Sequence, residues 1–148
     1  MKVALDTNIL VYMDDSEDAE RRDIAIDLLR RIPPEQILLP VQVLAEYYRV
    51  LTQKQGYPAD EAREMLIVWI ETFGSIETTP DIIVAAADIT ATGEVSFWDA
   101  IVLASAISAG CRILISEDMR SGFNFSGITV VDPFAETRHP LLELAFRG

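Results

Sequence analysis

Four acidic residues spread along the chain occupy positions where carboxylates are able to do chemistry. Asp6 and Asp118 each follow a short apolar run, and Asp99 lies in the first turn of a predicted helix. Glu46 lies on the polar side of a second predicted helix. Taken singly, each acid also has an ordinary explanation as a strand end, a turn residue, a helix-capping partner or a solvent-facing side chain.

The four carboxylates become informative when they are considered as one group, because no basic residue is obviously placed beside them. Two unit charges about 4 Å apart repel by ~4 kcal/mol at an effective dielectric constant of 20. Hard divalent cations such as Mg²⁺ or Mn²⁺ prefer oxygen ligands and keep several waters, so they suit such a group. These cations lower the pKa of a bound water and stabilise an oxygen that leaves phosphorus. The acids therefore indicate metal-assisted hydrolysis of a phosphate ester.

The residues that other hydrolytic mechanisms require are scarce. The only histidine is His139, so zinc fits badly and a ribonuclease mechanism built on two histidines is excluded. A Ser/His/Asp triad remains arithmetically possible, but the sequence has neither a GxSxG nucleophile motif nor a phosphate-binding glycine loop. The single cysteine, Cys111, lies in an apolar run and predicts a buried thiol without an internal disulfide.

The chain is acidic, with 12 basic and 24 acidic side chains and a formal net charge of −12. Read alone, this balance argues against contact with nucleic acids, whose phosphates are bound by clustered lysine and arginine. Where carboxylates hold metal ions, however, those ions become the largest local positive charges and reverse the sign of the charge that a phosphate meets. The acidic balance alone therefore does not settle whether the chain binds a nucleic acid. The sequence shows no secretory leader and no membrane-length apolar run, so we expect a cytoplasmic protein without membrane contact.

Short apolar runs alternate with amphipathic segments along the sequence. We predict strands at residues 2–6, 37–39, 76–78, 111–116 and 128–131. We predict helices at residues 9–13, from a Ser16 cap to Pro33, and at 40–55, 58–73, 80–92, 96–109 and 140–146. The helix at 96–109 is apolar on most of its circumference, so it should be covered on more than one side.

This alternation predicts one domain, residues 1–148, with an α/β fold of three layers in which helices cover a central, mainly parallel sheet. In such sheets, ligands bind beyond the carboxyl ends of the strands. Asp6 and Asp118 lie at such ends, and Asp99 begins a helix that packs nearby. Glu46 joins them if the polar side of its helix lines the same cleft.

Several short segments, in order along the chain, resemble the PIN-domain nucleases. They are Asp6-Thr7-Asn8, Glu46, Phe97-Trp98-Asp99-Ala100 and Ser116-Glu117-Asp118. The segment at residues 127–134 is similar to that of VapC toxins from toxin–antitoxin pairs, except for Asp132-Pro133, where relatives often have Asn-Pro. The family implies a three-layer α/β/α fold, dependence on Mg²⁺ or Mn²⁺, and endonucleolytic cleavage of RNA.

The resemblance also implies roles for individual residues. The implied metal-binding and catalytic acids are Asp6, Glu46, Asp99 and Asp118, and the implied supporting residues are Thr7, Asn8 and Ser116. We prefer Asp118 to Glu117 as the fourth acid, because Asp118 shares strand parity with Ser116 and Glu117 should point away. Arg49, on the Glu46 face, and Arg120, just beyond Asp118, are candidates for contact with RNA.

The partners implied by the family are an RNA substrate, a cognate antitoxin that inserts a basic segment near the acidic cleft, and a second copy in a homodimer. Two alternatives remain open. One is a non-catalytic PIN-like binding module, against which the intact set of acids argues. The other is a phosphohydrolase of the haloacid-dehalogenase type. That family requires a second aspartate where this chain has Asn8, and a late lysine, whereas no lysine follows Lys54.

Overall fold

The computed structural model describes all residues, 1–148, and contains one six-stranded sheet with the strand order β3-β2-β1-β4-β6-β5. The strands are β1 (Val3–Leu5), β2 (Ile37–Pro40), β3 (Gly74–Ile76), β4 (Ile113–Ile115), β5 (Asn124–Phe125) and β6 (Ile128–Val131). Every neighbouring pair is parallel except β5 and β6, which are antiparallel. The predicted, mainly parallel sheet is therefore confirmed.

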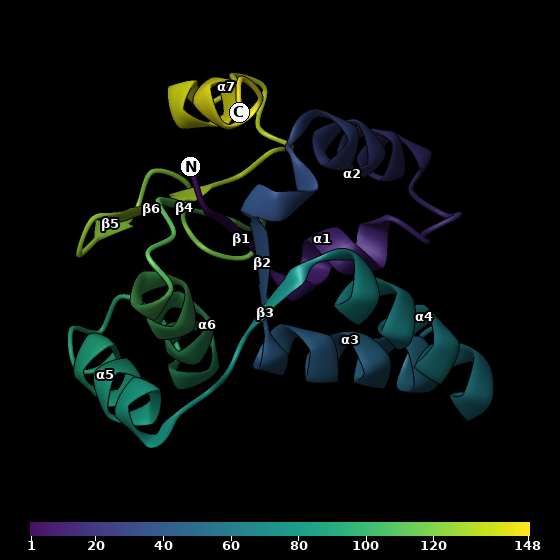
Figure 1. Ribbon diagram of the computed structural model, residues 1–148, viewed down its shortest axis with the longest axis horizontal. Helices are drawn as coiled ribbons and strands as arrows, with labels where there is room; N and C mark the ends of the chain where they lie inside the picture. The colour runs from purple at the N-terminus through teal and green to yellow at the C-terminus, as the bar shows by residue number, and fades with distance from the viewer.

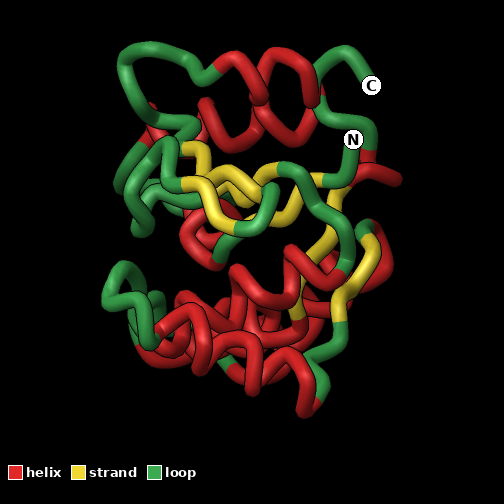
Figure 2. Tube along the Cα trace, turned by 90° about the vertical axis from the view of Figure 1, so that its left-hand side faces the viewer, coloured by secondary structure: helices red, strands yellow, loops and turns green.

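Helices lie on both sides of this sheet. They are α1 (Thr7–Tyr12), α2 (Ala19–Arg31), α3 (Val41–Gln53), α4 (Ala59–Thr72), α5 (Pro80–Thr90), α6 (Phe97–Ser108) and α7 (Pro140–Ala145), with a 3-10 turn at Pro34–Gln36. Figure 1 shows α2 and α7 above the sheet, and α3, α5 and α6 below it. Figure 2 shows the yellow strands between two layers of red helices, which confirms the three-layer α/β/α prediction. No helix combines the length and apolar character that crossing a membrane requires.

One continuous core of 35 buried residues joins the sheet to both helical layers. Strands β1 and β4 are buried at every position, because parallel strands covered on both faces need continuous apolar sequences. Helix α6 packs between α5 and the sheet, and residues 100–106 are all buried. The prediction that this helix is covered on more than one side is therefore confirmed.

Two helices begin at residues other than those predicted, because aspartates cap them. Helix α1 begins at residue 7 instead of 9, since the Asp6 carboxylate accepts a hydrogen bond from the Thr7 amide. Helix α2 begins after Asp18, whose carboxylate accepts the amide of Arg21 at 3.1 Å. The prediction that Ser16 caps this helix is therefore wrong.

Two strand predictions also differ from the structure. Strand β3 lies two residues before the predicted 76–78 and pairs with β2, where Gly74 avoids a clash because a Cβ would come within 2.6 Å of Leu38 Cδ2. Strand β5 was not predicted. It is joined to β6 by a two-residue turn in which Ser126 and Gly127 have φ values of 50° and 87°. Positive φ at both positions is typical of the tightest hairpin turns.

The sheet topology places the candidate acids. Strands β2, β1 and β4 are adjacent and parallel, so their carboxyl ends meet at one edge. Asp6 directly follows β1, Ser116 directly follows β4, and α3, which carries Glu46, directly follows β2. The chain therefore delivers polar residues from three neighbouring strands to the edge where ligands bind in parallel sheets.

Candidate active site

Asp6 is the only buried acid of the chain, with an exposed fraction of 4%. Its backbone amide donates to the Ile115 carbonyl of β4 at 3.0 Å, which fixes the end of β1 against β4. Its carboxylate accepts the Thr7 amide at 2.8 Å and the Ser116 hydroxyl at 2.7 Å. Burial raises the pKa of Asp6 to about 6, the two hydrogen bonds oppose this rise, and the charges of Asp99 and Asp118 add to it.

Hydrogen bonds join the end of β4 to the start of α1. The Ser116 hydroxyl oxygen accepts the Asp118 amide at 3.1 Å and the Asn8 side-chain amide at 3.4 Å. The Asn8 amide also donates to the Asp118 carboxylate at 3.1 Å, and the Asn8 side-chain carbonyl accepts the Glu117 amide at 3.3 Å. Asn8 therefore holds the loop after β4 in a conformation that keeps Asp118 beside α1.

Glu117 points away from these acids. Its carboxylate lies 2.9 Å from the guanidinium of Arg21, which also lies over the rings of Tyr12 and Phe134. A cation on α2 thus neutralises Glu117, whereas Asp118 has only the neutral amide of Asn8. This arrangement is what the alternation of side chains along an extended segment predicts.

Glu46 is held by two neutral donors. The Thr7 hydroxyl donates to one carboxylate oxygen at 2.8 Å, and the Gln42 side-chain amide donates to the other at 3.2 Å. The same Gln42 amide donates to the Trp98 carbonyl at 3.0 Å, so it ties α3 to the first turn of α6. The polar side of α3 therefore faces the other acids. Gln42 was not assigned a role from the sequence, although its spacing of four residues from Glu46 is the signal for such a pair.

Asp99 is half-buried in the first turn of α6, where its amide donates to the Ser96 hydroxyl at 3.2 Å. Burial raises the pKa of Asp99, a hydrogen bond with Ser96 lowers it, and the charges of Asp118 and Glu46 raise it. Asp99 is therefore close enough to acids from two other segments to feel their charges.

Together these contacts define the four-acid group: Asp6, Glu46, Asp99 and Asp118. None of its members takes part in an ion pair. No three histidine, cysteine, aspartate or glutamate side chains lie in a position to hold a metal ion by themselves. A closed cage is not required for Mg²⁺, which is usually held by one or two carboxylates, waters and substrate phosphates. Oxygen donors with uncompensated negative charge therefore fit such an ion.

A cavity of about 430 Å³ between α1 and α3 reaches this group, and we call it the α1–α3 groove. Its polar lining includes Thr7, Asn8, Glu46, Arg49, Lys54 and Asp118. Arg49, a candidate from the sequence, lies in the groove, and Lys54, which was not a candidate, lies there too. Arg120 instead lies 3.7 Å from Glu94 and over the ring of Phe123.

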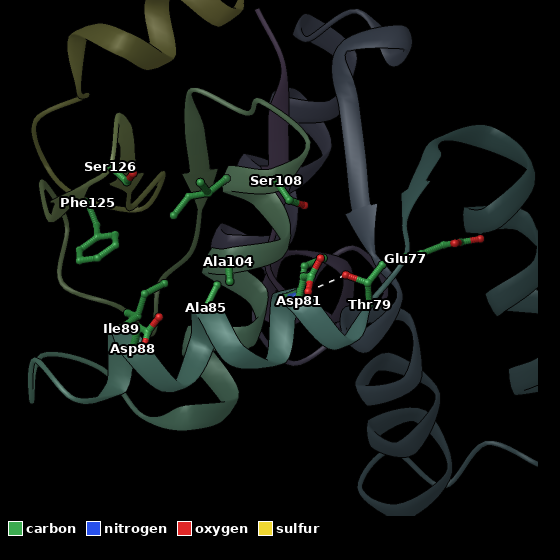
Figure 3. A pocket seen from close by; sticks show the side chains of 12 residues that line it. Glu77, Thr79, Asp81, Ala85, Asp88, Ile89, Ala104, Ser108, Phe125 and Ser126 are labelled. Atoms are coloured by element: carbon green, nitrogen blue, oxygen red, sulfur yellow. Dashed lines mark hydrogen bonds between the residues drawn. The ribbon is translucent and has the colours of Figure 1, made fainter.

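A larger cavity, of about 670 Å³, lies between α5, α6 and the β5–β6 hairpin. Figure 3 shows Ala85 and Ile89 of α5 facing Ala104 of α6, with Phe125 on the hairpin side. Glu77, Asp81 and Asp88 also line it, but no lysine or arginine and no member of the four-acid group does. Of these two cavities, only the smaller α1–α3 groove reaches the four-acid group.

Several solved structures resemble this fold. The VapC20 toxin of Mycobacterium tuberculosis, described as cleaving the sarcin–ricin loop, has a TM-score of 0.65 and 20% identity, covering 76% of this chain and 87% of its own. A toxin–antitoxin complex from Klebsiella pneumoniae has a TM-score of 0.68 and 23% identity, covering 90% and 98%. VapBC2 of Rickettsia felis, bound to a DNA fragment from its promoter, has a TM-score of 0.64 and 16% identity, covering 88% and 97%.

At these identities the likeness concerns the fold alone. No curated protein matches the chain in sequence. The family model of the PIN domain, however, matches residues 3–124, a stretch that contains all members of the four-acid group and most of the sheet. The chain therefore belongs to the PIN domain family.

Proposed function

We propose that this chain is a metal-dependent endoribonuclease, the toxin of a type II toxin–antitoxin pair, which hydrolyses RNA phosphodiester bonds with a metal-activated water. The observation that carries this proposal is the four-acid group, which gathers carboxylates from separate segments at one sheet edge without a pairing cation. Membership of the PIN family and the fold shared with an RNA-cleaving toxin support it.

Asp6, Glu46, Asp99 and Asp118 are the residues that would hold Mg²⁺ or Mn²⁺. When bound, the ion supplies a water of lowered pKa and a positive charge for the oxygen that leaves phosphorus. The carboxylates bring the negative charge and oxygen donors for that ion to the edge of the sheet. Asp6 has a pKa of about 6, so it is mainly ionised at neutral pH and available as a ligand.

Three neutral residues orient these carboxylates. Thr7 donates to Glu46, Ser116 donates to Asp6, and Asn8 donates to Asp118. Each donor occupies a lone pair of one acid without cancelling its charge, so each acid keeps its capacity for a cation. We infer that Thr7, Asn8 and Ser116 act as positioning residues.

The proposal also covers the domain organisation, location and protein partners of the enzyme. We propose that residues 1–148 act as one domain in the cytoplasm, form a homodimer and bind a cognate antitoxin. Support comes from the single sheet that unites all strands, and from structural neighbours that are toxin–antitoxin complexes. Exposed apolar side chains on α4 and α5, among them Val68 and Val84 with exposed fractions of 62% each, offer surface for such contacts.

The test is incubation of the purified protein with total cellular RNA in Mg²⁺, Mn²⁺ or EDTA, beside Asp99→Asn and Asp88→Asn. Asp88 is an exposed acid on α5, so its variant controls for the loss of one charge. We expect discrete cuts with 5′-phosphate ends in either metal, retained in Asp88→Asn and absent in EDTA and Asp99→Asn. If the wild type does not cut RNA and does not bind a metal ion, this result would contradict the proposal and favour the non-catalytic binding module. The haloacid-dehalogenase alternative is set aside, because the chain belongs to the PIN family.

A further inference from the structure

Few positive charges of this acidic chain are available to a polyanion. Half of the 12 basic side chains are in ion pairs with neighbouring acids. These are Arg21, Arg22, Arg31, Arg63, Arg120 and Arg138. The cations outside ion pairs are Lys2, Arg30, Arg49, Lys54, Arg112 and Arg147. An RNA strand that reaches the four-acid group would therefore depend on this second set.

Of the cations outside ion pairs, Arg49 and Lys54 alone line the α1–α3 groove. Lys2 and Arg112 precede β1 and β4, at the sheet edge opposite the acids, and Lys2 donates to the Ala109 carbonyl. The remaining two, at residues 30 and 147, belong to the end of α2 and the segment after α7, in the other helical layer. The groove is therefore the one place where free cations and the four-acid group meet.

The two cations follow Glu46 along α3. At a rise of 1.5 Å per residue, Arg49 lies about 4.5 Å and Lys54 about 12 Å beyond Glu46 along the helix axis. Val11 and Val50 line the groove as well and provide apolar surface for sugars or bases. The groove thus has acids that suit a metal at one end and cations spaced along its length.

Acidic residues surround the end of the α1–α3 groove near Lys54. Asp14, Asp15 and Glu17 line a hollow that Lys54 also lines, so phosphates beyond Lys54 would meet negative charge. Asp15 lines the α1–α3 groove too, and its carboxylate accepts only the Glu17 amide, at 2.9 Å. The attractive part of the groove is therefore short, and it ends near Lys54.

We propose that an unpaired RNA strand runs along α3 from the four-acid group to Lys54, with Arg49 and Lys54 each contacting a phosphate on one side of the cut. This inference rests on the proposed function. The α1–α3 groove, with a volume of about 430 Å³, has the size of an ordinary ligand pocket and offers Arg49 and Lys54 to the phosphates of one strand. RNA-binding proteins commonly read unpaired strands in this way, through backbone charges and exposed bases.

The test is steady-state cleavage of an unstructured RNA over a range of salt concentrations by wild type, Arg49→Gln and Lys54→Gln. Arg112→Gln is the matched control, because it removes the same charge at the opposite sheet edge. We expect each groove variant to raise KM with little change in kcat, and to reduce the slope of log KM against log salt by about 0.7 per lost phosphate contact on a single strand. Asp15→Asn should lower KM, and Arg112→Gln should match the wild type.

Shortened substrates provide a second readout. For the wild type, trimming the RNA on one side of the cut should raise KM, whereas trimming the other side should not. The double variant Arg49→Gln/Lys54→Gln should lose this asymmetry. Groove variants that behave like Arg112→Gln, or a wild type that tolerates trimming on both sides, would overturn the inference.

Failure of the proposed function would give a different pattern. If the wild type cuts no RNA, the same variants are compared for binding of a fluorescent unstructured RNA in Mg²⁺. A salt slope reduced in the groove variants alone would support the groove as a binding surface. Equal binding by wild type, groove variants and Arg112→Gln would overturn the inference.

Discussion

Replacing Asp6 by asparagine should stabilise the folded protein at alkaline pH, although Asp6 is buried and hydrogen-bonded. Burial raises the pKa of its carboxyl from 3.8 to about 6. Ionising Asp6 therefore costs about 3 kcal/mol more in the folded than in the unfolded chain. Because the folded state binds this proton more tightly, the wild type loses stability as the pH rises from about 4 to above 6.

The structure sets the size of the effect. Between about pH 4.5 and pH 8, the titration of Asp6 removes about 2 kcal/mol from wild-type stability, and asparagine has no such titration. Asparagine offers one acceptor oxygen for the two donors on Asp6, the Thr7 amide and the Ser116 hydroxyl. One lost hydrogen bond costs about 1 kcal/mol at every pH. The variant should therefore match the wild type near pH 4.5 and exceed it by about 2 kcal/mol at pH 8.

The assay is urea unfolding followed by circular dichroism, in EDTA so that no divalent ion binds. Asp88→Asn removes one exposed charge from α5 and corrects for the change in net charge. A difference in stability between Asp6→Asn and wild type that does not grow with pH would show that ionised Asp6 does not destabilise the fold. So would a variant that is less stable than the wild type at pH 8, since Asp6 would then be compensated or purely structural.

Three further predictions concern the same edge of the sheet. Ser116→Ala removes the hydroxyl that donates to Asp6, so it should lower stability by about 1–3 kcal/mol and raise the pKa of Asp6; a pH–rate profile should show the acidic limb of activity moving to higher pH. Asp118→Asn should lose cleavage, whereas Glu117→Gln should cleave within a few-fold of the wild-type rate, because Glu117 is paired with Arg21. The check is to measure the cleavage rates of both variants on the same RNA. Mg²⁺ at about 100 times its Kd should stabilise the wild type by about 2.7 kcal/mol in urea unfolding, and Asp99→Asn should lose most of this gain.

The fold could be predicted because its strongest signals are local. Strands β1 and β4 are continuous apolar runs, and each is followed at once by a polar residue of the site. Parallel pairing then brings Asp6 and Ser116 to the same edge without further information. Strand β5 carried no such signal, because it is two residues long and its turn begins with Ser126, a residue type that seldom adopts positive φ.

The electrostatics of the site could not be predicted in the same way, because ion pairing depends on contacts between distant segments. Arg49 and Arg120 looked equivalent as cations near the acids, but Glu94, from before α6, pairs with Arg120. The sequence places Glu46 on a polar strip of its helix. Only the packing of α1 against α3, in which the Thr7 hydroxyl donates to the Glu46 carboxylate, shows that this strip faces the α1–α3 groove. Lys54 follows α3 and lies in no sequence motif that would mark it as a candidate for contact with RNA.

The decisive experiment is single-turnover cleavage of one defined RNA in Mg²⁺, because the proposed function requires that the four-acid group cuts RNA as one unit. The proteins compared are the wild type, Asp6→Asn, Glu46→Gln, Asp99→Asn and Asp118→Asn, each shown to be folded by circular dichroism. We predict 5′-phosphate and 3′-hydroxyl ends for the wild type and losses of at least about 100-fold in every variant. A folded variant that keeps the wild-type rate, or products ending in a 2′,3′-cyclic phosphate, would contradict the proposed function.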